Sequence, residues 1–485
     1  MKLQIFKKKT ALLSIKKLSI SKHLTKAVLF SACLSTFAYG EQKPNIVFIL
    51  ADDLGYNQIG ANGGKMIKTP NIDQLAVDGI RFTQAYSGNT VCSPSRVSLM
   101  TGRDGRFMEN NSNTVKLKEI DVTIADVLKH ASYDTALFGK YSIGYEMGVT
   151  DPQAKGFDTW YGMFGILEGH RQYPYYLWRD GKRERVEANE GGKKGAYAQE
   201  LFTNEAINYI EQKHDNPFFV MVNYTTPHGE LGAPKKYVDM YNGKFDETPY
   251  TGMSTGTPSD RYARYYPEPI DNPNATLAGM VTALDDYVGQ IKTALKEKGV
   301  LDNTIIIFTS DNGPHDEGGA DPLYMKAAQP YKGQKRDLYD GGIHVPMIVH
   351  WPAGISKPRV DATPWAFADV LPTFADLAGV NLRTVAKLRS NGVSIRGLLQ
   401  DTPEKMAERT LYWEFGKQAG DANSGIIGDV YQAARRGHFK AVRYTMEGAV
   451  ELYNIDKDPG ETKELSKEEP EIYQEFVELF KKHQG

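Results

Sequence analysis

Cysteine is nearly absent from this sequence, whose 485 residues contain only Cys33 and Cys92. So few cysteines exclude a scaffold held together by several disulfides. Cys33 lies in an N-terminal segment that we expect to be removed, which leaves a single thiol with no partner for an internal disulfide. A lone thiol in an oxidising compartment is either buried or used chemically. A small buried core residue is the ordinary interpretation of Cys92, but the residues around it indicate a chemical role.

Net positive charge is confined to the N-terminus. Residues 1–40 contain eight lysines and no acidic residue, so removing them from a formal net charge of −2 leaves −10. An acidic body is a poor candidate for non-specific nucleic-acid binding, and we expect no nucleic-acid partner. The hydrophobic fraction of 41% and the charged fraction of 24% are typical of a globular protein and exclude a largely disordered chain.

Long apolar runs are lacking as well. The apolar N-terminal stretch, Ala27–Phe37, is too short to cross a bilayer. It follows a lysine-rich segment and precedes Ala38-Tyr39-Gly40, where small residues stand at the expected cleavage positions. We therefore predict that residues 1–40 are a signal peptide and that the mature chain is exported, periplasmic or secreted, with no stable membrane insertion. The alternatives are a disordered or anchoring N-terminus and a lipoprotein cleaved before Cys33.

Short, nearly continuous apolar runs alternate with helical patterns along the chain. Such runs are typical of strands buried on both faces of a parallel sheet. The alternation predicts an α/β fold in which a large, mainly parallel central sheet is flanked by helices. Ligands of such sheets bind at the carboxyl ends of the strands. The predicted strands are 45–50, 218–222, 305–308 and 345–349, and the predicted helices are 123–131, 198–212 and 277–298.

The pattern changes near residue 381. We predict a catalytic domain over residues 41–380 and a smaller C-terminal α+β subdomain, containing an antiparallel sheet, over residues 381–485. Residues 241–274, rich in Pro, Gly, Ser and Tyr, indicate a long surface excursion. The predicted C-terminal strands are 410–415, 439–444 and 451–453, followed by an amphipathic helix over 468–483.

Polar pairs follow two of the predicted central strands. Asp52-Asp53 comes directly after the first strand, and Asp311-Asn312 follows the strand at 305–308. Carboxylate and amide oxygens suit a hard cation, either Ca²⁺ or Mg²⁺. A turn capped by an aspartate is the alternative for Asp52-Asp53-Leu54-Gly55 taken alone. Two such pairs at the ends of buried strands favour a metal site.

The segment that begins at Cys92 has the features of an anion-binding helix start. Pro94 suits the first turn of a helix, where its missing N–H costs nothing. Cys92 would then precede the free N–H groups and positive dipole end of that helix. Arg96 adds a permanent charge that can pair with an oxyanion. A plain helix start is the alternative interpretation of a Cys-Ser-Pro loop.

Cys92-Ser93-Pro94-Ser95-Arg96 through Leu99-Met100-Thr101-Gly102-Arg103 resembles the C-x-P-x-R…L-x-T-G-R signature of type I sulfatases, arylsulfatase-like enzymes of the alkaline phosphatase superfamily. The resemblance extends from about Pro44 to Glu461. Further matching blocks are Ala51-Asp52-Asp53-Leu54-Gly55, Thr69-Pro70-Asn71-Ile72-Asp73, Phe138-Gly139-Lys140, Thr226-Pro227-His228, Ser310-Asp311-Asn312-Gly313 and Tyr339-Asp340-Gly341-Gly342.

The resemblance implies a role for each matching residue. Cys92 matches the residue that a formylglycine-generating maturation enzyme oxidises to formylglycine, whose hydrated form attacks sulfur. Arg96 would hold that hydrate. The groups that bind sulfate oxygens and assist the leaving group would be Lys140, His228 and Lys335. The implied ligands of Ca²⁺, with Mg²⁺ less favoured, are Asp52, Asp53, Cys92, Asp311 and Asn312.

The chain departs from the family pattern at Ser142. Many members have a histidine there, which the family uses as the base that regenerates the aldehyde. A serine has no useful pKa near neutrality, so that role does not transfer. We hypothesise that His315, which follows Asp311-Asn312-Gly313-Pro314, takes it over. The alternatives are that His315 contacts substrate or caps the turn.

Substrate indications are fewer. Segments 168–173 and 431–436 mix aromatic, polar and cationic residues, which suits an anionic polysaccharide, and His170 and Arg171 are the candidate substrate contacts. We expect a sulfatase that acts on an external sulfated glycan, with aryl sulfates as surrogate substrates. A phosphoester or phosphonate hydrolase of the same superfamily and a non-catalytic glycan-binding protein are the alternatives.

Overall fold

The computed structural model describes residues 43–108, 111–252, 268–400, 406–416 and 430–483. Lys43–Gly485 forms one compact unit, and the predicted signal peptide lies outside the described residues. No helix in these ranges is long and apolar enough to cross a membrane. The domain boundary near residue 381 remains a prediction.

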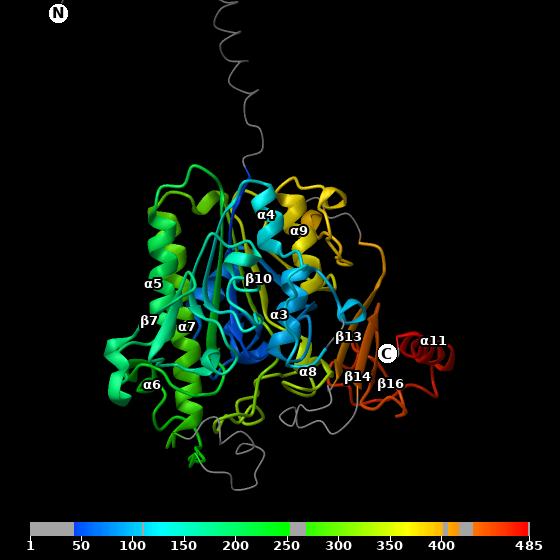
Figure 1. Ribbon diagram of the computed structural model, residues 1–485. Helices are drawn as coiled ribbons and strands as arrows, with labels where there is room; N and C mark the ends of the chain where they lie inside the picture. The colour runs from blue at the N-terminus through cyan, green and yellow to red at the C-terminus, as the bar shows by residue number, and fades with distance from the viewer. Residues whose placement is uncertain (1–42, 109–110, 253–267, 401–405, 417–429, 484–485) are drawn as a thin grey trace, which may run out of the picture. The chain divides into compact units, whose positions relative to one another are not determined.

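A ten-stranded sheet runs through the centre of the unit, in the order β11-β2-β10-β9-β1-β8-β4-β5-β6-β7 (Figure 1). The strands from β9 to β5 are parallel, as predicted. Antiparallel pairs occur on both sides of this block, at β10 and at β6 and β7. The strands are β1 (Asn45–Asp52), β2 (Ile80–Phe82), β4 (Asp134–Lys140), β5 (Thr159–Met163), β6 (Tyr176–Arg179), β7 (Lys182–Arg185), β8 (Phe218–Pro227), β9 (Thr304–Ser310), β10 (Met347–His350) and β11 (Arg359–Asp361).

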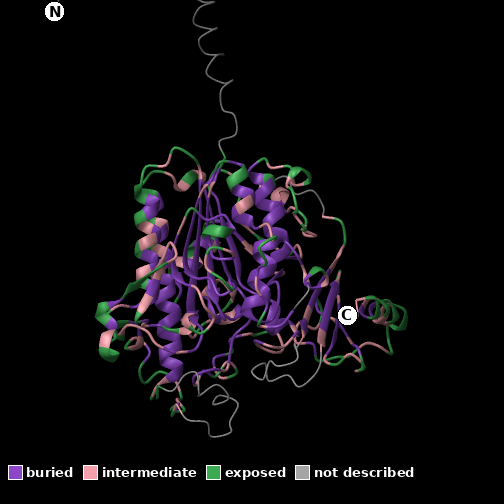
Figure 2. Ribbon diagram, viewed as in Figure 1, coloured by how far each residue is buried: buried purple, intermediate pink, exposed green. Residues whose placement is uncertain are grey.

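Helices cover both faces of this sheet, so its central strands are buried throughout (Figure 2). Val47 and Ile49 of β1 pack in a core with residues of α2, α5 and α7, whereas Ile46 and Phe48 pack on the other face with residues of α3, α4 and α9. This alternation explains the continuous apolar pattern of the strand. The helices are α2 (Pro70–Asp78), α3 (Cys92–Thr101), α4 (Ile124–His130), α5 (Ala198–Glu211), α6 (Lys235–Val238), α7 (Pro273–Glu297), α8 (Asp340–Ile343), α9 (Val370–Leu377) and α10 (Arg396–Leu399).

A second, antiparallel sheet near the C-terminus has the order β13-β14-β15-β16. It packs against the closing amphipathic helix, α11, through Phe476 and Phe480. A two-stranded sheet pairs β3 with β12. The predicted C-terminal antiparallel sheet and helix are therefore confirmed. The bounds are β3 (Ala85–Tyr86), β12 (Trp365–Ala366), β13 (Thr410–Gly416), β14 (Val430–Arg436), β15 (Phe439–Arg443), β16 (Glu451–Asn454) and α11 (Pro470–Lys482).

Two features differ from the sequence predictions. The strand predicted at 345–349 is β10, which lies antiparallel to β9 and β2; its apolar residues show burial on both faces but not strand direction. Segment 431–436, interpreted as sugar-binding, forms most of β14, and Gln432 and Arg435 are buried. These two side chains support the sheet and do not face solvent. Within the predicted excursion 241–274, residues 253–267 lie outside the described ranges, and Tyr250 pairs with Ile270.

A buried ion cluster joins the C-terminal sheet to the start of α8. Lys440 of β15 donates to Asp340 Oδ1 at 2.7 Å and to Glu461 Oε1 at 2.9 Å. Glu461 also accepts the Asp340 backbone N–H at 2.6 Å. Asp340 begins α8, five residues after Lys335, so the C-terminal sheet holds the segment that carries one of the predicted site residues.

Replacing Lys440 with methionine should destabilise the protein strongly. The variant leaves two buried carboxylates without their cation, and the loss of one partner of a buried pair costs about 3–5 kcal/mol. Equilibrium unfolding in urea measures the change. Lys463→Met, which removes an exposed pair with Glu468, is the matched control and should shift stability by less than about 1 kcal/mol. Equal effects of the two variants would contradict the assigned role of Lys440.

Candidate active site

Four neighbouring parallel strands end at one edge of the sheet, and each delivers a polar side chain there. β9 leads into Asp311, β1 ends at Asp52, β8 leads into His228 and β4 ends at Lys140. These strands are adjacent in the order β9-β1-β8-β4. Parallel neighbours bring their carboxyl ends together, so the topology gathers side chains that are far apart in the sequence.

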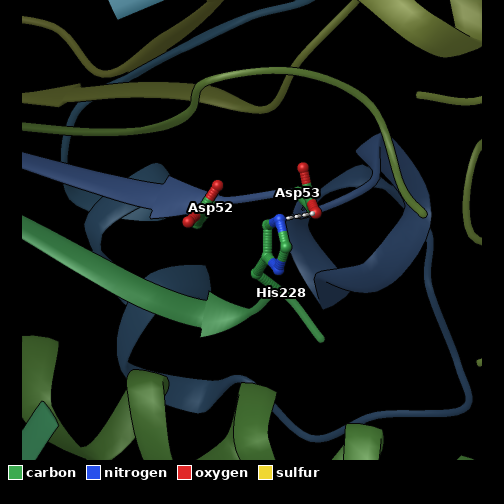
Figure 3. A group of neighbouring side chains, drawn as sticks. All are labelled: Asp52, Asp53 and His228. Atoms are coloured by element: carbon green, nitrogen blue, oxygen red, sulfur yellow. Dashed lines mark ion pairs between the residues drawn. The ribbon is translucent and has the colours of Figure 1, made fainter. Parts of the chain in front are cut away.

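The acidic residues at this edge are fully buried. Asp52, Asp53 and Asp311 have no exposed surface, and the backbone N–H of Asp53 donates to Asp311 Oδ1 at 3.1 Å. Burial, together with the charge of Asp311, raises the pKa of Asp52 well above its usual value. Figure 3 shows Asp52 and Asp53 at the end of β1 facing His228 at the end of β8, with 3.4 Å between His228 Nε2 and Asp53 Oδ2.

Cys92 is the first residue of α3, and every residue of this helix is buried. The Cys92 Sγ is 3.8 Å from Asn113 Oδ1. Burial raises the pKa of the Cys92 thiol, so the unmodified side chain is a poor thiolate nucleophile at neutral pH. One turn later, Arg96 donates through Nε to Asp311 Oδ2 at 2.9 Å and through Nη1 to the Lys140 carbonyl at 2.9 Å.

The cations of the site are paired one by one with its carboxylates. Lys140 Nζ is 2.5 Å from Asp52 Oδ2, and Lys335 Nζ is 2.8 Å from Asp53 Oδ2. Although burial opposes the charge, Asp53 raises the pKa of Lys335, which therefore stays protonated. Lys335 also donates to Nε2 of His228 at 2.9 Å. Burial, reinforced by the charge of Lys335, lowers the pKa of His228 well below its usual value and keeps the ring neutral.

The acidic end of the site has the donor set of a metal centre. Ligand atoms of Asp52, Asp53 and His228 lie within 4.8 Å of one another, as do those of Asp52, Cys92 and Asp311. Within the described part of the chain, Oδ1 of Asp52 and Oδ1 of Asn312 are buried and accept no hydrogen bond. Asn312 Nδ2 donates to Asp53 Oδ1 at 2.6 Å, which turns its oxygen away from that carboxylate. Unsatisfied buried oxygens among several buried carboxyl groups fit a hard cation.

The remaining predicted residues surround His228. His315 is stacked near it, with ring centroids 5.7 Å apart. Nε2 of His315 lies 2.8 Å from the Pro227 carbonyl, and its Nδ1 accepts the Glu317 N–H at 3.0 Å. His170 stacks directly on His228 at 4.1 Å and 13°. The side chain of Arg171 is 48% exposed, beside Glu230 at 3.3 Å. The structure thus brings all the predicted site residues into one region.

Sequence reasoning missed Glu317. It is buried and lies 3.1 Å from Lys335 and 2.7 Å from Arg336. Although burial opposes ionisation, Lys335 and Arg336 hold the pKa of Glu317 well below its usual value. The carboxylate therefore holds the Lys335 ammonium together with Asp53. A buried acid in an irregular segment has no periodic signal, and only its place six residues after Asp311 could have suggested it.

Ser142 leaves space that a neighbouring turn fills. A Cβ added to Gly169, in the turn η5 (Glu168–His170), would lie 2.8 Å from Ser142 Oγ and 3.0 Å from Lys140 Cγ. The turn is also held by Glu168, which accepts hydrogen bonds from Tyr176 and Trp178. The small side chains at 142 and 169 therefore let the turn lie on Lys140 and present His170 to His228.

Comparison with known proteins decides the family. A family model described as Sulfatase matches residues 44–380, most of the chain. The chain belongs to the sulfatase family. A second model, described as N-sulphoglucosamine sulphohydrolase, C-terminal, matches residues 333–484. The resemblance predicted from Cys92–Arg103 is confirmed, and with it the assignment as a sulfuric ester hydrolase of alkaline phosphatase-like fold.

Several named sulfatases are similar over most of their length. Arylsulfatase A from Homo sapiens is 28% identical over 90% of this chain and 87% of its own. The Ulvan-active sulfatase of Formosa agariphila is 28% identical over 86% of this chain and 76% of its own. Among solved structures, Ps i-CgsB in complex with k-i-k-neocarrahexaose superposes with a TM-score of 0.75 at 28% identity, covering 91% of this sulfatase and 92% of that chain.

Substituting Gly169 by alanine should destabilise this sulfatase and disturb η5. The new methyl group would overlap Ser142 and Lys140, and overpacking of this kind costs about 1–3 kcal/mol. Ser142→His should have a similar effect, since it fills the same space. Thermal unfolding measures both. Gly165→Ala is the matched control, because its Cβ meets no atom closer than 3.7 Å. Unchanged stability in Gly169→Ala would contradict the packing described here.

Proposed function

We propose that this protein is an exported, calcium-dependent sulfatase that removes sulfate from a sulfated glycan, with a formylglycine made from Cys92. The observation that carries the proposal is the meeting, at one sheet edge, of buried carboxylates, the start of α3 and three buried cations. A formylglycine-generating maturation enzyme is the partner that the proposal requires. Export, calcium and the modification go beyond the family assignment.

The proposed metal ligands are Asp52, Asp53, Asp311, Asn312 and the modified residue 92. Their oxygens favour a hard cation over a soft transition metal. We favour Ca²⁺ over Mg²⁺, because the ligands all come from the protein, whereas Mg²⁺ usually keeps several waters and takes only one or two carboxylates. Bound Ca²⁺ and formylglycine would supply a polarised hydroxyl nucleophile beside residue 92.

Charge balance explains why such a site binds an anion. Each carboxylate already has a cationic partner: Lys140 for Asp52, Lys335 for Asp53 and Arg96 for Asp311. A divalent cation adds positive charge that these residues cannot neutralise. The free N–H groups at the start of α3 add a further anion-binding element. A sulfate ester, which carries one negative charge, offsets part of this excess in this buried place.

The chain's own residues divide the remaining tasks between them. Lys140 and Lys335 stay protonated and bind sulfate oxygens from two sides, which stabilises the charge that builds up there. Arg96 fixes Asp311 and the end of β4 by its hydrogen bonds. His228 keeps its proton on Nδ1, facing the Gly229 carbonyl, and its Nε2 orients the Lys335 ammonium. Burial of the whole group excludes water and strengthens each interaction.

The residues between the buried site and solvent favour a glycan substrate. His170 stacks on the buried His228, and the neighbouring Arg171 reaches solvent. An exposed guanidinium beside a buried anion site suits a polyanionic chain, in which further sulfate or carboxylate groups lie near the one that is cleaved. Two similar proteins, the Ulvan-active sulfatase and Ps i-CgsB in complex with k-i-k-neocarrahexaose, support the same substrate class.

Removal and return of Ca²⁺ should change the stability of the protein. Ca²⁺ binds only the folded state, which gains about 2.7 kcal/mol at a concentration one hundred times the dissociation constant. We expect Tm to fall with chelator, to recover with Ca²⁺ more than with Mg²⁺, and to stop responding in Asp53→Asn. Asp78→Asn, at an exposed pair with Lys292, is the control and should keep the response. A Tm that does not depend on Ca²⁺ would contradict the proposed metal site.

Matured enzyme should prefer an aryl sulfate to the matching aryl phosphate. One metal site beside residue 92 and the maturation motif favour sulfate, whereas a phosphoester or phosphonate hydrolase of the superfamily would show the opposite order. Steady-state kcat/KM for the two esters decides between them. Cys92→Ala should fold normally and lose sulfate release. Preference for phosphate, or full sulfate release by Cys92→Ala, would overturn the proposal.

A further inference from the structure

An ion pair between Arg171 and Glu230 lies between the buried site and solvent. Arg171 Nη1 is 3.3 Å from Glu230 Oε2, and the side chains are 48% and 16% exposed, respectively. Burial raises the pKa of Glu230, although the charge of Arg171 opposes this shift. The carboxylate is therefore largely shielded from water, and a hydrogen bond to it is stronger than one to an open surface group.

Two chain segments carry this pair, and contacts between the segments fix its position. The backbone N–H of Glu230 donates to the His170 carbonyl at 3.3 Å, and Gln172 donates through Nε2 to the His228 carbonyl at 3.4 Å. Between these bonds, the rings of His170 and His228 stack with their centroids 4.1 Å apart. The positions of Arg171 and Glu230 therefore do not depend on the ion pair alone.

The same two segments contact groups to which the proposed function assigns the sulfate. His228, which Figure 3 shows at the end of β8, has its Nε2 2.9 Å from Lys335 Nζ. On the other segment, a Cβ added to Gly169 would lie 3.0 Å from Lys140 Cγ. The ion pair follows one residue after η5 and two residues after the histidine. It is thus a partly exposed polar pair directly beside the residues that bind sulfate.

Much of the hydrogen-bonding capacity of this pair is unused within the described part of the chain. A guanidinium has five N–H donors, and the Arg171 side chain donates there only to Glu230. The Glu230 carboxylate accepts no other hydrogen bond in these residues. A carboxylate beside a guanidinium matches adjacent oxygens of a sugar ring, because one hydroxyl group donates to the carboxylate while its neighbour accepts from the guanidinium.

We propose that Arg171 and Glu230 determine the specificity of this sulfatase by binding the sugar ring that carries the scissile sulfate. Glu230 accepts a hydrogen bond from a free hydroxyl group beside the sulfate ester. Arg171 donates to the next oxygen of the ring, which belongs to a hydroxyl group or to a further sulfate. The inference rests on the proposed function and extends it, because it names the part of the glycan that is recognised.

Two classes of ester test this role in matured, calcium-loaded enzyme. Nitrophenyl sulfate has no ring hydroxyl groups, whereas monosulfates of galactose, N-acetylgalactosamine and N-acetylglucosamine have them. We expect wild type to prefer at least one sugar sulfate. Glu230→Met and Arg171→Met should lower kcat/KM for that ester by about 10- to 100-fold, the value of one hydrogen bond to a charged group. Both variants should leave kcat/KM for nitrophenyl sulfate unchanged.

Two further variants are matched to these. Glu230→Gln keeps an acceptor oxygen without the charge, so we expect it to lose less than Glu230→Met on the sugar sulfate. Glu184→Gln, which removes an exposed pair with Arg179, is the control and should keep kcat/KM for both esters. Equal losses on the two esters would show that the pair only holds His170 against His228, and would overturn the proposal. Undiminished kcat/KM for the sugar sulfate in both methionine variants would overturn it as well.

A binding measurement separates this inference from the proposed function. Calorimetry of calcium-loaded Cys92→Ala protein gives affinities for the same esters without turnover. We expect tighter binding of a sugar sulfate than of nitrophenyl sulfate, and loss of that difference when Glu230→Met is added. Wild-type enzyme that releases no sulfate from any ester would refute the proposed function, while these affinities would still decide the role of the pair. Equal affinities for the two classes, or a preference that survives Glu230→Met, would refute that role alone. If Glu230→Met does not fold, Arg171→Met and Glu230→Gln decide.

Discussion

Three carboxylates without access to water dominate this structure. Asp52, Asp53 and Asp311 lie at the ends of β1 and β9, where burial makes ionisation costly. Each is ionised only if a cation lies against it, and the structure supplies Lys140, Lys335 and Arg96 for that purpose. The same cations that stabilise these buried carboxylates also provide a preorganised positive electrostatic potential for an anionic substrate.

The positions of these cations depend on contacts in other parts of the molecule. Lys335 comes from an irregular segment, so its position depends on contacts at both ends. Glu317 and Asp53 fix its ammonium, and the Asp340–Lys440–Glu461 cluster anchors the following turn to the C-terminal sheet. The C-terminal sheet thus contributes to the active site without supplying one of its predicted residues. Lys140 and Arg96 depend instead on β4 and α3, which belong to the packed central layers.

Much of the fold and of the site could be predicted from the sequence. Continuous apolar runs showed which strands are buried, and the polar pairs at their ends indicated which side chains lie together, because parallel strands end together. The direction of β10 could not be predicted, since its apolar residues look the same in either orientation. Glu317 was missed for a different reason: it lies in an irregular segment, and its significance comes from burial beside residues distant in sequence.

The surroundings of Ser142 show how the fold accommodates a serine where many family members have a histidine. The small side chain lets Gly169 pack on Lys140, and the backbone carbonyl of Ser142 accepts a hydrogen bond from the Lys116 amine. The neighbourhood of position 142 therefore differs in shape and charge from one that holds a histidine. Turn η5 packs against Lys140 and Ser142, and Asn113 lies beside Cys92.

The central claim is that residue 92, at the buried meeting point of carboxylates and cations, is a modified nucleophile and not a cysteine. Mass spectrometry of the peptide that contains Cys92, after expression with and without a formylglycine-generating maturation enzyme, tests it directly. We predict conversion of the thiol to the aldehyde only with the maturation enzyme, and sulfate release in proportion to the converted fraction. An unmodified thiol in fully active protein would contradict the account.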